Sequence, residues 1–496
     1  MGSFSVWHWV IVLIVVMLIF TQTRQAARNL SEVAGGNLVH SITAYIVAAL
    51  HDGALSAQTT IDRLGDRHRA KLPELGIDTE KILLEAKKSR ARNYKFGVVY
   101  LLLSIWLLES LLHFPKIEEG DLSVAEYING LLSPLLIIAA LGTAKILLVN
   151  RYLRIEIPKI DNPISLKFSE NVIVFGGFSP FAGFGDDLDS WSFTINTTRP
   201  IENSSKPTES FTQQELLDFV ALQLQNNIQS AFRADLFFVS GRHIRANARF
   251  LSSHTAAPVS KIAAEDISAE IGRPDSTWRH YRSLTMPISG GHLALTFFLR
   301  STSIGVNTFI ESRCFVLSPI KPDYTSLNDL PSRTGPNYMY RLIRSKILLS
   351  PFSWFAGSLH PLDAISRAFR FVRWSIFGDP EDKQKKRDVC YNYGHTKSFR
   401  ETLASNTYQT YFQIIDKDRI AKTVQYITLN SIVEFLDEHG VATDEIKERR
   451  TQIFNSGVIV SGGVLNAQQL AVGSGAKAKM SGVMSAFKSK GVPDVK

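Results

Sequence analysis

Hydrophobic residues are concentrated in three segments at the start of the chain, and later segments alternate between apolar and polar positions. The three segments cover residues 7–20, 96–114 and 131–149. The second and third are close to the ~20 residues that a helix needs to cross a bilayer, and the first is shorter. The pattern therefore predicts a short transmembrane anchor at 1–20, followed by a transmembrane helical hairpin at 96–149.

Charged residues around the hairpin predict its orientation. The connection between its two helices is acidic, with Glu118, Glu119, Asp121 and Glu126. The flanks are basic, with Lys87, Lys88, Arg90, Arg92 and Lys95 before the pair and Arg151, Arg154 and Lys159 after it. Because positive flanks stay in the cytosol, we expect the acidic loop outside and everything after residue 150 inside. The chain is thus predicted to be a multi-pass protein of the cell inner membrane, with a lipid bilayer as its partner and most of its residues in the cytoplasm.

The segment after the hairpin carries both strand and helix periodicities, which predicts an α+β fold. β-branched and aromatic runs bounded by turn residues indicate strands at 171–175, 191–197 and 234–240. Apolar residues at helical spacing, preceded by a capping signal, indicate a helix at 211–232. Further along, three apolar runs, the first two joined by a glycine pair, indicate a β-meander. Helical spacing returns at 396–438.

These patterns divide the chain into consecutive regions. The predicted fold class is α+β, with three N-terminal transmembrane helices (the short anchor plus the hairpin), a cytosolic α+β body and a helical C-terminal region. The regions are 1–20 short transmembrane anchor, 21–95 cytosolic helical segment, 96–149 transmembrane hairpin, 150–335 cytosolic α+β domain, 336–390 basic aromatic segment and linker, 391–450 helical region and 451–496 Gly/Val-rich tail.

A basic segment rich in aromatic residues precedes the charged linker. Its apolar positions keep helical spacing at Leu362, Ile365, Phe369, Val372 and Ile376. The arginines fall mostly on another side of the same helix, and aromatic residues widen its apolar surface, so that Arg367, Arg370, Arg373 and Trp374 are candidate membrane-interface residues. Such a helix can lie in a membrane interface. It can equally pack on the body with its arginines in solvent, and the sequence leaves both interpretations open.

Composition narrows the class of protein without naming a reaction. Apolar residues make up 45% of the chain, the mean hydropathy is +0.01, and the net charge is +9. These values fit a few membrane spans plus a soluble body, and the basic balance suits an anionic membrane better than a nucleic acid, for which there is no strong signal. Cys314 and Cys390 lack metal-ligand spacing and are expected to be reduced thiols. No HExxH or GxSxG occurs, so no metal site is predicted, and catalytic residues and cofactors stay unknown.

The glycine-rich loop at 176–191 is the densest candidate for binding chemistry. Glycine lets a backbone approach a phosphate, and exposed N–H groups can surround an anion. The predicted ligand-binding residues are Gly176, Gly177, Ser179, Gly183, Gly185, Asp186, Asp187 and Trp191. The loop matches neither of the standard phosphate-binding glycine motifs. The alternative is a turn-rich connection whose residues Phe178, Phe181 and Phe184 pack into the core.

The C-terminal tail changes to short β-branched runs cut by glycines. Identical segments of this kind can pair in register, and amide side chains can form ladders between them. The candidate assembly residues are Val458, Ile459, Val460, Gly462, Gly463 and Asn466. The tail resembles the Gly/Val/Asn motifs at the ends of bacterial amyloid-type signalling proteins, which implies self-association. A strand docked on its own domain, or a disordered tail, are the alternatives.

The opening MGSFSVWHWVIVLIVVMLIF is similar to the first helix of the small pore-forming subunit of the twin-arginine protein translocase. The likeness implies a short anchor with its N-terminus outside and with Trp7 and Trp9 at the membrane interface. It covers residues 1–20 only, and the segment that follows lacks the expected glycine hinge and basic Leu-Pro start. The remainder resembles uncharacterised bacterial membrane proteins with an SPF-glycine loop and a similar tail.

Taken together, these features favour a membrane-anchored cytosolic sensor, scaffold or effector over an enzyme. Stress or phage-defence signalling would suit that layout. One alternative is a membrane-bound enzyme that acts on a nucleotide or lipid head group through the loop at 176–191. Another is an accessory component of protein export, which rests on residues 1–20 alone.

Overall fold

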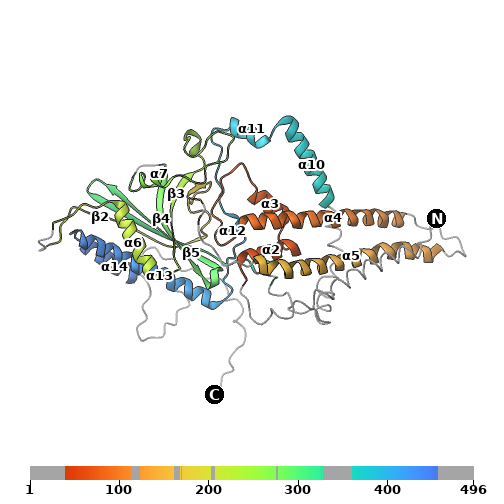
Figure 1. Cartoon of the computed structure of the whole chain (residues 1–496), viewed down its shortest axis with the longest axis horizontal. Coiled ribbons are helices and arrows are strands. Elements are labelled where there is room, and N and C mark those ends of the chain that lie inside the picture. The colour runs from red at the N-terminus through yellow and green to blue at the C-terminus, as the bar shows by residue number, and fades with distance from the viewer. Residues whose placement is uncertain are drawn as a thin grey trace, which may run out of the picture.

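A pair of long helices extends from one end of a mixed α/β body in the computed structural model (Figure 1). The structure describes residues 40–112, 123–160, 168, 170–202, 207–228, 230–274, 277–325, 327 and 360–455. The predicted anchor at 1–20, with Trp7 and Trp9, and the predicted assembly residues 458–466 lie outside the described residues.

The N-terminal helices are α2 (Ile42–Asp52), α3 (Ala57–Leu64), α4 (Thr79–Leu112) and α5 (Ser123–Ile160). Helix α2 begins where Ser41 Oγ accepts the Ala44 N–H, and it ends at Gly53, whose φ of 92° suits a left-handed cap. Nearly every residue of α2 is buried, because the helix lies between the body and the ends of α4 and α5 that are nearest to it. The hairpin is therefore joined to the body through a common hydrophobic core.

The body is built on one six-stranded sheet with the strand order β1-β3-β4-β5-β6-β2. Its strands are β1 (Val172–Phe175), β2 (Asp186–Asn196), β3 (Phe232–Ser240), β4 (Trp278–Ile288), β5 (Leu293–Ile304) and β6 (Asn307–Leu317). Strands β1 and β3 are parallel, and the other neighbours are antiparallel. The predicted α+β class and the β4–β5–β6 meander are confirmed.

The two faces of the sheet carry different cores. On one face, α6 (Gln213–Asn227) and α13 (Tyr411–Glu438) pack over the leucines, isoleucines and valines of the central strands. On the other face, an aromatic core gathers Phe181, Phe184 and Phe298. The ring centroids of Phe181 and Phe298 are 4.9 Å apart, and those of Phe184 and Phe298 are 4.8 Å apart in an edge-to-face arrangement.

The remaining helices include α7 (Ala264–Ser268), α10 (His360–Phe377), α11 (Pro380–Arg387), α12 (Phe399–Thr402) and α14 (Asp444–Asn455). Short 3-10 turns lie at Ile244–Ala246, Ser289–Gly291 and Pro322–Tyr324. Helix α13 ends just before Gly440, whose φ is 71°, as its place after the last apolar position predicts.

Several element boundaries differ from the expectations. The helical region predicted at 396–438 consists of the short α12 (Phe399–Thr402), a non-helical connection and α13, which begins only at Tyr411. The helix predicted at 211–232 ends at Asn227, and Phe232 instead begins β3. The strand predicted at 191–197 begins five positions earlier at Asp186, because residues from Asp186 onward pair with β6. Tertiary hydrogen bonding across the sheet overrides the local preference of acidic residues for turns.

The structure supports one of the three predicted spans. Within the described residues, only the part of α5 at Leu132–Ile160 is long and apolar enough to cross a membrane, by length and composition. The first predicted span lies outside the described part of the chain. The second falls in the C-terminal half of α4, which does not meet the same test of length and composition within the described residues.

Candidate functional site

Three distant parts of the sequence meet where the hairpin joins the body. They are the connection between α3 and α4, the residues just before β1, and the segment that leads into α12. Together they line a cavity of about 270 Å³ whose wall is mostly polar. Thr79 and Glu80 belong to this wall and also form the first turn of α4, so the cavity lies at the foot of the hairpin.

Glycines bring the segment before α12 across the end of the parallel strand pair. A Cβ atom on Gly394 would lie 2.3 Å from the Phe175 carbonyl carbon, and one on Gly241 would lie 2.3 Å from the Gly394 nitrogen. Asn392 Nδ2 donates to the Gly176 carbonyl at 2.8 Å, and the Gly176 N–H donates to the His395 carbonyl at 2.8 Å. Side chains at these positions would push the segment away from the sheet edge, so the glycines help to place His395 at the cavity.

Glu74 is the most perturbed carboxyl group of the cavity. Its two oxygens accept the backbone N–H groups of Phe399 and Arg400 at 2.6 and 2.7 Å, at the start of α12. Burial raises the pKa of Glu74 to about 7, although both hydrogen bonds act to lower it. Glu170 shares the cavity, and burial raises its pKa as well, while Lys71 opposes the shift. Both carboxyl groups are therefore easier to protonate than ordinary glutamates.

His395 provides a nitrogen base in the same cavity. Its Nε2 lies 3.6 Å from Asp66 Oδ2. Burial lowers the pKa of His395, and the positive charge of Arg63 lowers it further. A histidine with a lowered pKa and two carboxyl groups with raised pKa values in one cavity form an arrangement found at ligand-binding and proton-transfer sites. Arg63, Lys71 and Lys397 add positive charge to the wall.

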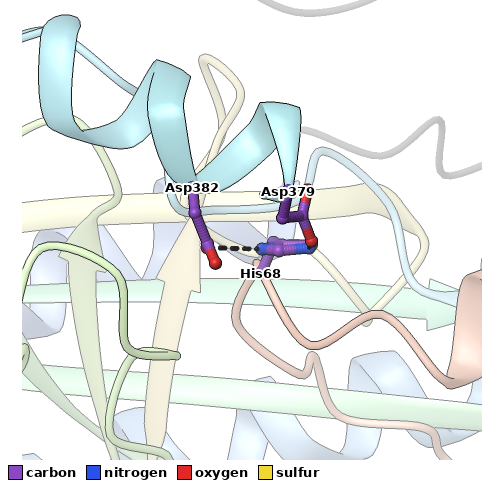
Figure 2. Close-up of side chains that lie close together, drawn as sticks. All are labelled: His68, Asp379 and Asp382. Atoms are coloured by element: carbon purple, nitrogen blue, oxygen red, sulfur yellow. Dashed lines mark ion pairs between the residues drawn. The ribbon is translucent and has the colours of Figure 1, made fainter. Parts of the chain in front are cut away.

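A second titratable cluster lies next to the cavity and contains His68, Asp379 and Asp382 (Figure 2). His68 Nε2 lies 3.1 Å from Asp379 Oδ2, and His68 Nδ1 lies 3.4 Å from Asp382 Oδ1. Arg67 Nη2 also donates to Asp379 Oδ2 at 2.6 Å. Burial alone would raise the pKa of Asp379, but the hydrogen bonds from Arg67 and from the Glu381 N–H outweigh it and lower the pKa.

These three side chains bring potential metal ligands within 4.8 Å of one another. However, the imidazole ring lies between the two carboxylates, with one acid facing each ring nitrogen. A metal ion needs both carboxylates near a single nitrogen, whereas here each carboxylate faces a different ring nitrogen. The cluster is better described as an ion-paired clamp that joins the residues before α4 to the start of α11.

The predicted glycine loop borders segments that line the cavity but contributes no lining residue itself, and Glu401 occupies the backbone N–H groups of Gly183 and Gly185. The Gly185 N–H donates to Glu401 Oε1 at 2.9 Å, and the Gly183 N–H also bonds this carboxylate. A Cβ on Gly185 would lie 2.1 Å from the Val316 carbonyl oxygen, so the glycine allows the strand to approach β6. Gly185 thus allows close packing against β6, and the N–H groups of Gly183 and Gly185 bind the Glu401 carboxylate. Ligand binding by the loop stays a prediction.

The other predicted residues of the loop are distributed along the edge of the sheet. Asp186 and Asp187 lie on β2, where Asp187 Oδ2 is 3.5 Å from Arg313 Nη1, and Trp191 stacks on Phe193 at 5.2 Å. Ser179 Oγ accepts the Phe181 N–H at 3.3 Å. Gly177 is near Thr396, and a Cβ on Gly183 would lie 3.0 Å from the Pro73 carbonyl oxygen, so this part of the loop touches segments that also line the cavity.

Sequence reasoning missed the cavity and the clamp. Arg67 and Asp379 are separated by 312 positions, and neither lies in a recognisable motif. The charged run after Gly378 indicated only a linker, although Asp379 followed by Pro380 is a helix-start signal. The predicted interface residues on α10 are found on an exposed helix, with Arg367 paired to Asp363.

Comparison with known proteins gives one family. The family model for the AbeC-like domain matches residues 190–468, which is more than half of the chain. The match begins within β2 and covers the remainder of the sheet and the C-terminal helices, but neither the hairpin nor residues 1–20. No solved structure matches the chain.

Proposed function

This chain belongs to the AbeC-like domain family, and from that premise we propose that it is a membrane-anchored sensor or effector whose α+β body lies in the cytoplasm. The hairpin anchors the protein in the cell inner membrane, and the cavity at its foot binds a small polar ligand. A role in stress or phage-defence signalling is compatible with the family. The family assigns no catalytic activity.

The exposed apolar surface of the hairpin supports the anchor. Along the half of α4 that is far from the body, Leu102 is 62% exposed, and Ile105 and Leu108 are similarly open. On α5, Leu132, Leu135 and Leu136 are exposed in the same way. Soluble monomers rarely expose a contiguous apolar surface of this kind, whereas a bilayer would bury it. This exposed surface is the observation that carries the proposal.

Basic residues support the expected orientation. Lys87, Lys88 and Arg92 lie on α4 before the apolar half begins, and Arg151 and Arg154 follow it on α5. They therefore form a band between the exposed apolar surface and the body. Positive charge at this level favours the cytosolic side for the body.

The route from cavity to hairpin supports a sensing role. Lys71 and Glu74 on the cavity wall belong to the segment that leads directly into α4 at Thr79. A ligand that contacts this segment and the start of α12 would alter the position of the helix relative to the body. Ligands shift a conformational equilibrium in this way only by binding one state better than the other.

The anchor is tested by placing a charge on the apolar surface. We expect Ile105→Arg to weaken membrane insertion, because an arginine within the hydrocarbon core is costly, by about 2.5–3.5 kcal/mol on insertion scales. Leu222→Arg on α6 is the matched control, since Leu222 and Ile105 are each 55% exposed. The measurement is the fraction of full-length protein that stays in the membrane pellet after carbonate extraction. Release of the wild-type chain by carbonate would refute the anchor.

A further inference from the structure

Helix α10 presents an apolar surface that nothing in the described chain covers. Phe369 is 71% exposed, and Phe371 and Ile376 are each 69% exposed. The same helix also exposes Leu362, Ile365, Val372, Trp374 and Phe377. Figure 1 shows α10 extending away from α4 and from the sheet. Exposure of so many large apolar side chains on one helix indicates a binding surface.

The helix is amphipathic. Leu362, Ile365, Phe369, Val372 and Ile376 recur at intervals of three and four, which places them on one face. The arginines recur at intervals of three: Arg367 and Arg370 fall on another side of the helix, and Arg373 lies at the border of the apolar face. A helix with arginines beside an aromatic and aliphatic face is typical of segments that lie in the plane of a membrane interface.

Contacts at both ends hold α10 beside the expected cytosolic boundary of the hairpin. One end meets α4 near the middle of that helix, where the predicted span begins after Lys95 (Figure 1). At the other end, Gly378 has a φ of 75° and redirects the chain into α11. There Asp379 bonds Arg67 and His68, which fixes this end to the body. The helix therefore lies at the level where a bilayer anchored by α4 and α5 would have its head groups.

We propose that α10 binds the cytosolic surface of an anionic bilayer. Its apolar face enters the boundary between head groups and acyl chains, and Arg367, Arg370 and Arg373 bind lipid phosphates or carboxylates. This inference rests on the proposed anchor, which brings α10 to the surface. The charge of the helix favours an anionic bilayer as the partner. The helix has three arginines and one acid, Asp363, and each basic residue near an anionic membrane surface adds to the binding free energy.

The test places a fluorescent probe on each side of the helix in the full-length protein. In a Cys390→Ser background, which removes the exposed native cysteine, Phe369→Cys and Arg370→Cys are labelled with an environment-sensitive dye. The labelled proteins are reconstituted into liposomes of phosphatidylcholine, with and without phosphatidylglycerol, that contain brominated acyl chains. We expect quenching at position 369 but not at 370, only with phosphatidylglycerol, and less of it at high salt.

A charge-reversed variant separates lipid attraction from simple burial. Arg370→Glu combined with Arg373→Glu, with the probe at position 369, is expected to lose the dependence on phosphatidylglycerol. Equal quenching at 369 and 370, or quenching unaffected by phosphatidylglycerol, would overturn the proposal. So would a probe at 369 that is shielded from aqueous iodide yet not quenched by lipid, because protein would then cover the face. Carbonate extraction of the same samples reports separately on the hairpin, so failure of the anchor is distinguishable.

Discussion

Two charged side chains between the sheet and α6, Asp235 and Arg282, each form hydrogen bonds or ion pairs with more than one partner. Asp235 on β3 accepts from His280 Nε2 at 2.8 Å and from Arg282 Nε at 2.6 Å, both on β4. Arg282 is fully buried and also pairs with Asp218 on α6. Burial would raise the pKa of Asp235, but His280 and Arg282 together lower it to about 2. The network joins a helix to two strands.

The Asp235 network predicts a pH-dependent loss of stability. Because the folded-state pKa lies below the ordinary value, the ionised carboxylate stabilises the fold above pH ~4, and this contribution is lost as pH falls toward 2. We expect Asp235→Asn to lower the free energy of unfolding by roughly 2 kcal/mol at pH 7. Denaturation of the detergent-solubilised protein at pH 7 and pH 3 measures the difference. Asp323→Asn, at an exposed acid, is the control, and an equal effect of both variants would contradict the assignment.

At the scale of elements, a buried polar network ties α2 to both helices of the hairpin. Glu85 on α4 accepts from His51 of α2 at 2.9 Å, from Tyr152 of α5 at 2.7 Å and from Lys88 at 2.7 Å. Ser89 and Arg92 of α4 donate to the carbonyls of Leu50 and His51 at the end of α2. Burial would raise the pKa of Glu85, yet the hydrogen bonds from His51, Lys88 and Tyr152 lower it to about 2.

The Glu85 network predicts which helix loosens first. In Glu85→Gln the carboxylate that joins the three helices is lost, and an amide cannot accept from all of its donors. We expect backbone amides of α2 to exchange with deuterium faster, while those of the β4–β5–β6 meander stay unchanged. Hydrogen exchange on the full-length protein measures this, with Glu80→Gln at an exposed position of the same helix as the control. Unaltered protection of α2 would mean that apolar packing alone holds it.

At the scale of the whole molecule, the cavity, the clamp and the hairpin share one segment of chain. The connection between α3 and α4 supplies Arg67 and His68 to the clamp and Lys71 and Glu74 to the cavity before it becomes α4. A ligand in the cavity would therefore contact the same segment that holds one end of α10 and leads into the hairpin. The proposed sensing role relies on this shared segment.

The proposed ligand predicts a bound species that depends on the cavity. Native mass spectrometry of the detergent-solubilised wild-type chain is expected to show a small polar molecule. Lys71→Trp would place an indole at the cavity wall and remove that species, whereas Lys261→Trp, at an exposed lysine away from the cavity wall, would keep it. A bare wild-type protein, or the same bound mass in both variants, would contradict ligand binding in this cavity.

Hydrophobic periodicity by itself determined much of the outline of this protein. The meander, the long helix that ends before Gly440 and the apolar part of α5 each follow from side-chain spacing within a short stretch, because burial of one face depends on local pattern. The amphipathic helix at 360–377 was visible for the same reason, although the sequence did not decide what its apolar face contacts.

Only the tertiary structure decided where distant side chains meet. The glycines of the loop at 176–191 suggested ligand binding, but Gly185 permits contact with β6 and its N–H bonds Glu401, which is 216 positions away. Likewise, no spacing rule brings His68 to Asp379 or Glu74 to the start of α12. The shift in the pKa of Glu74 comes from burial by segments far along the chain, and such burial exists only once the chain has folded.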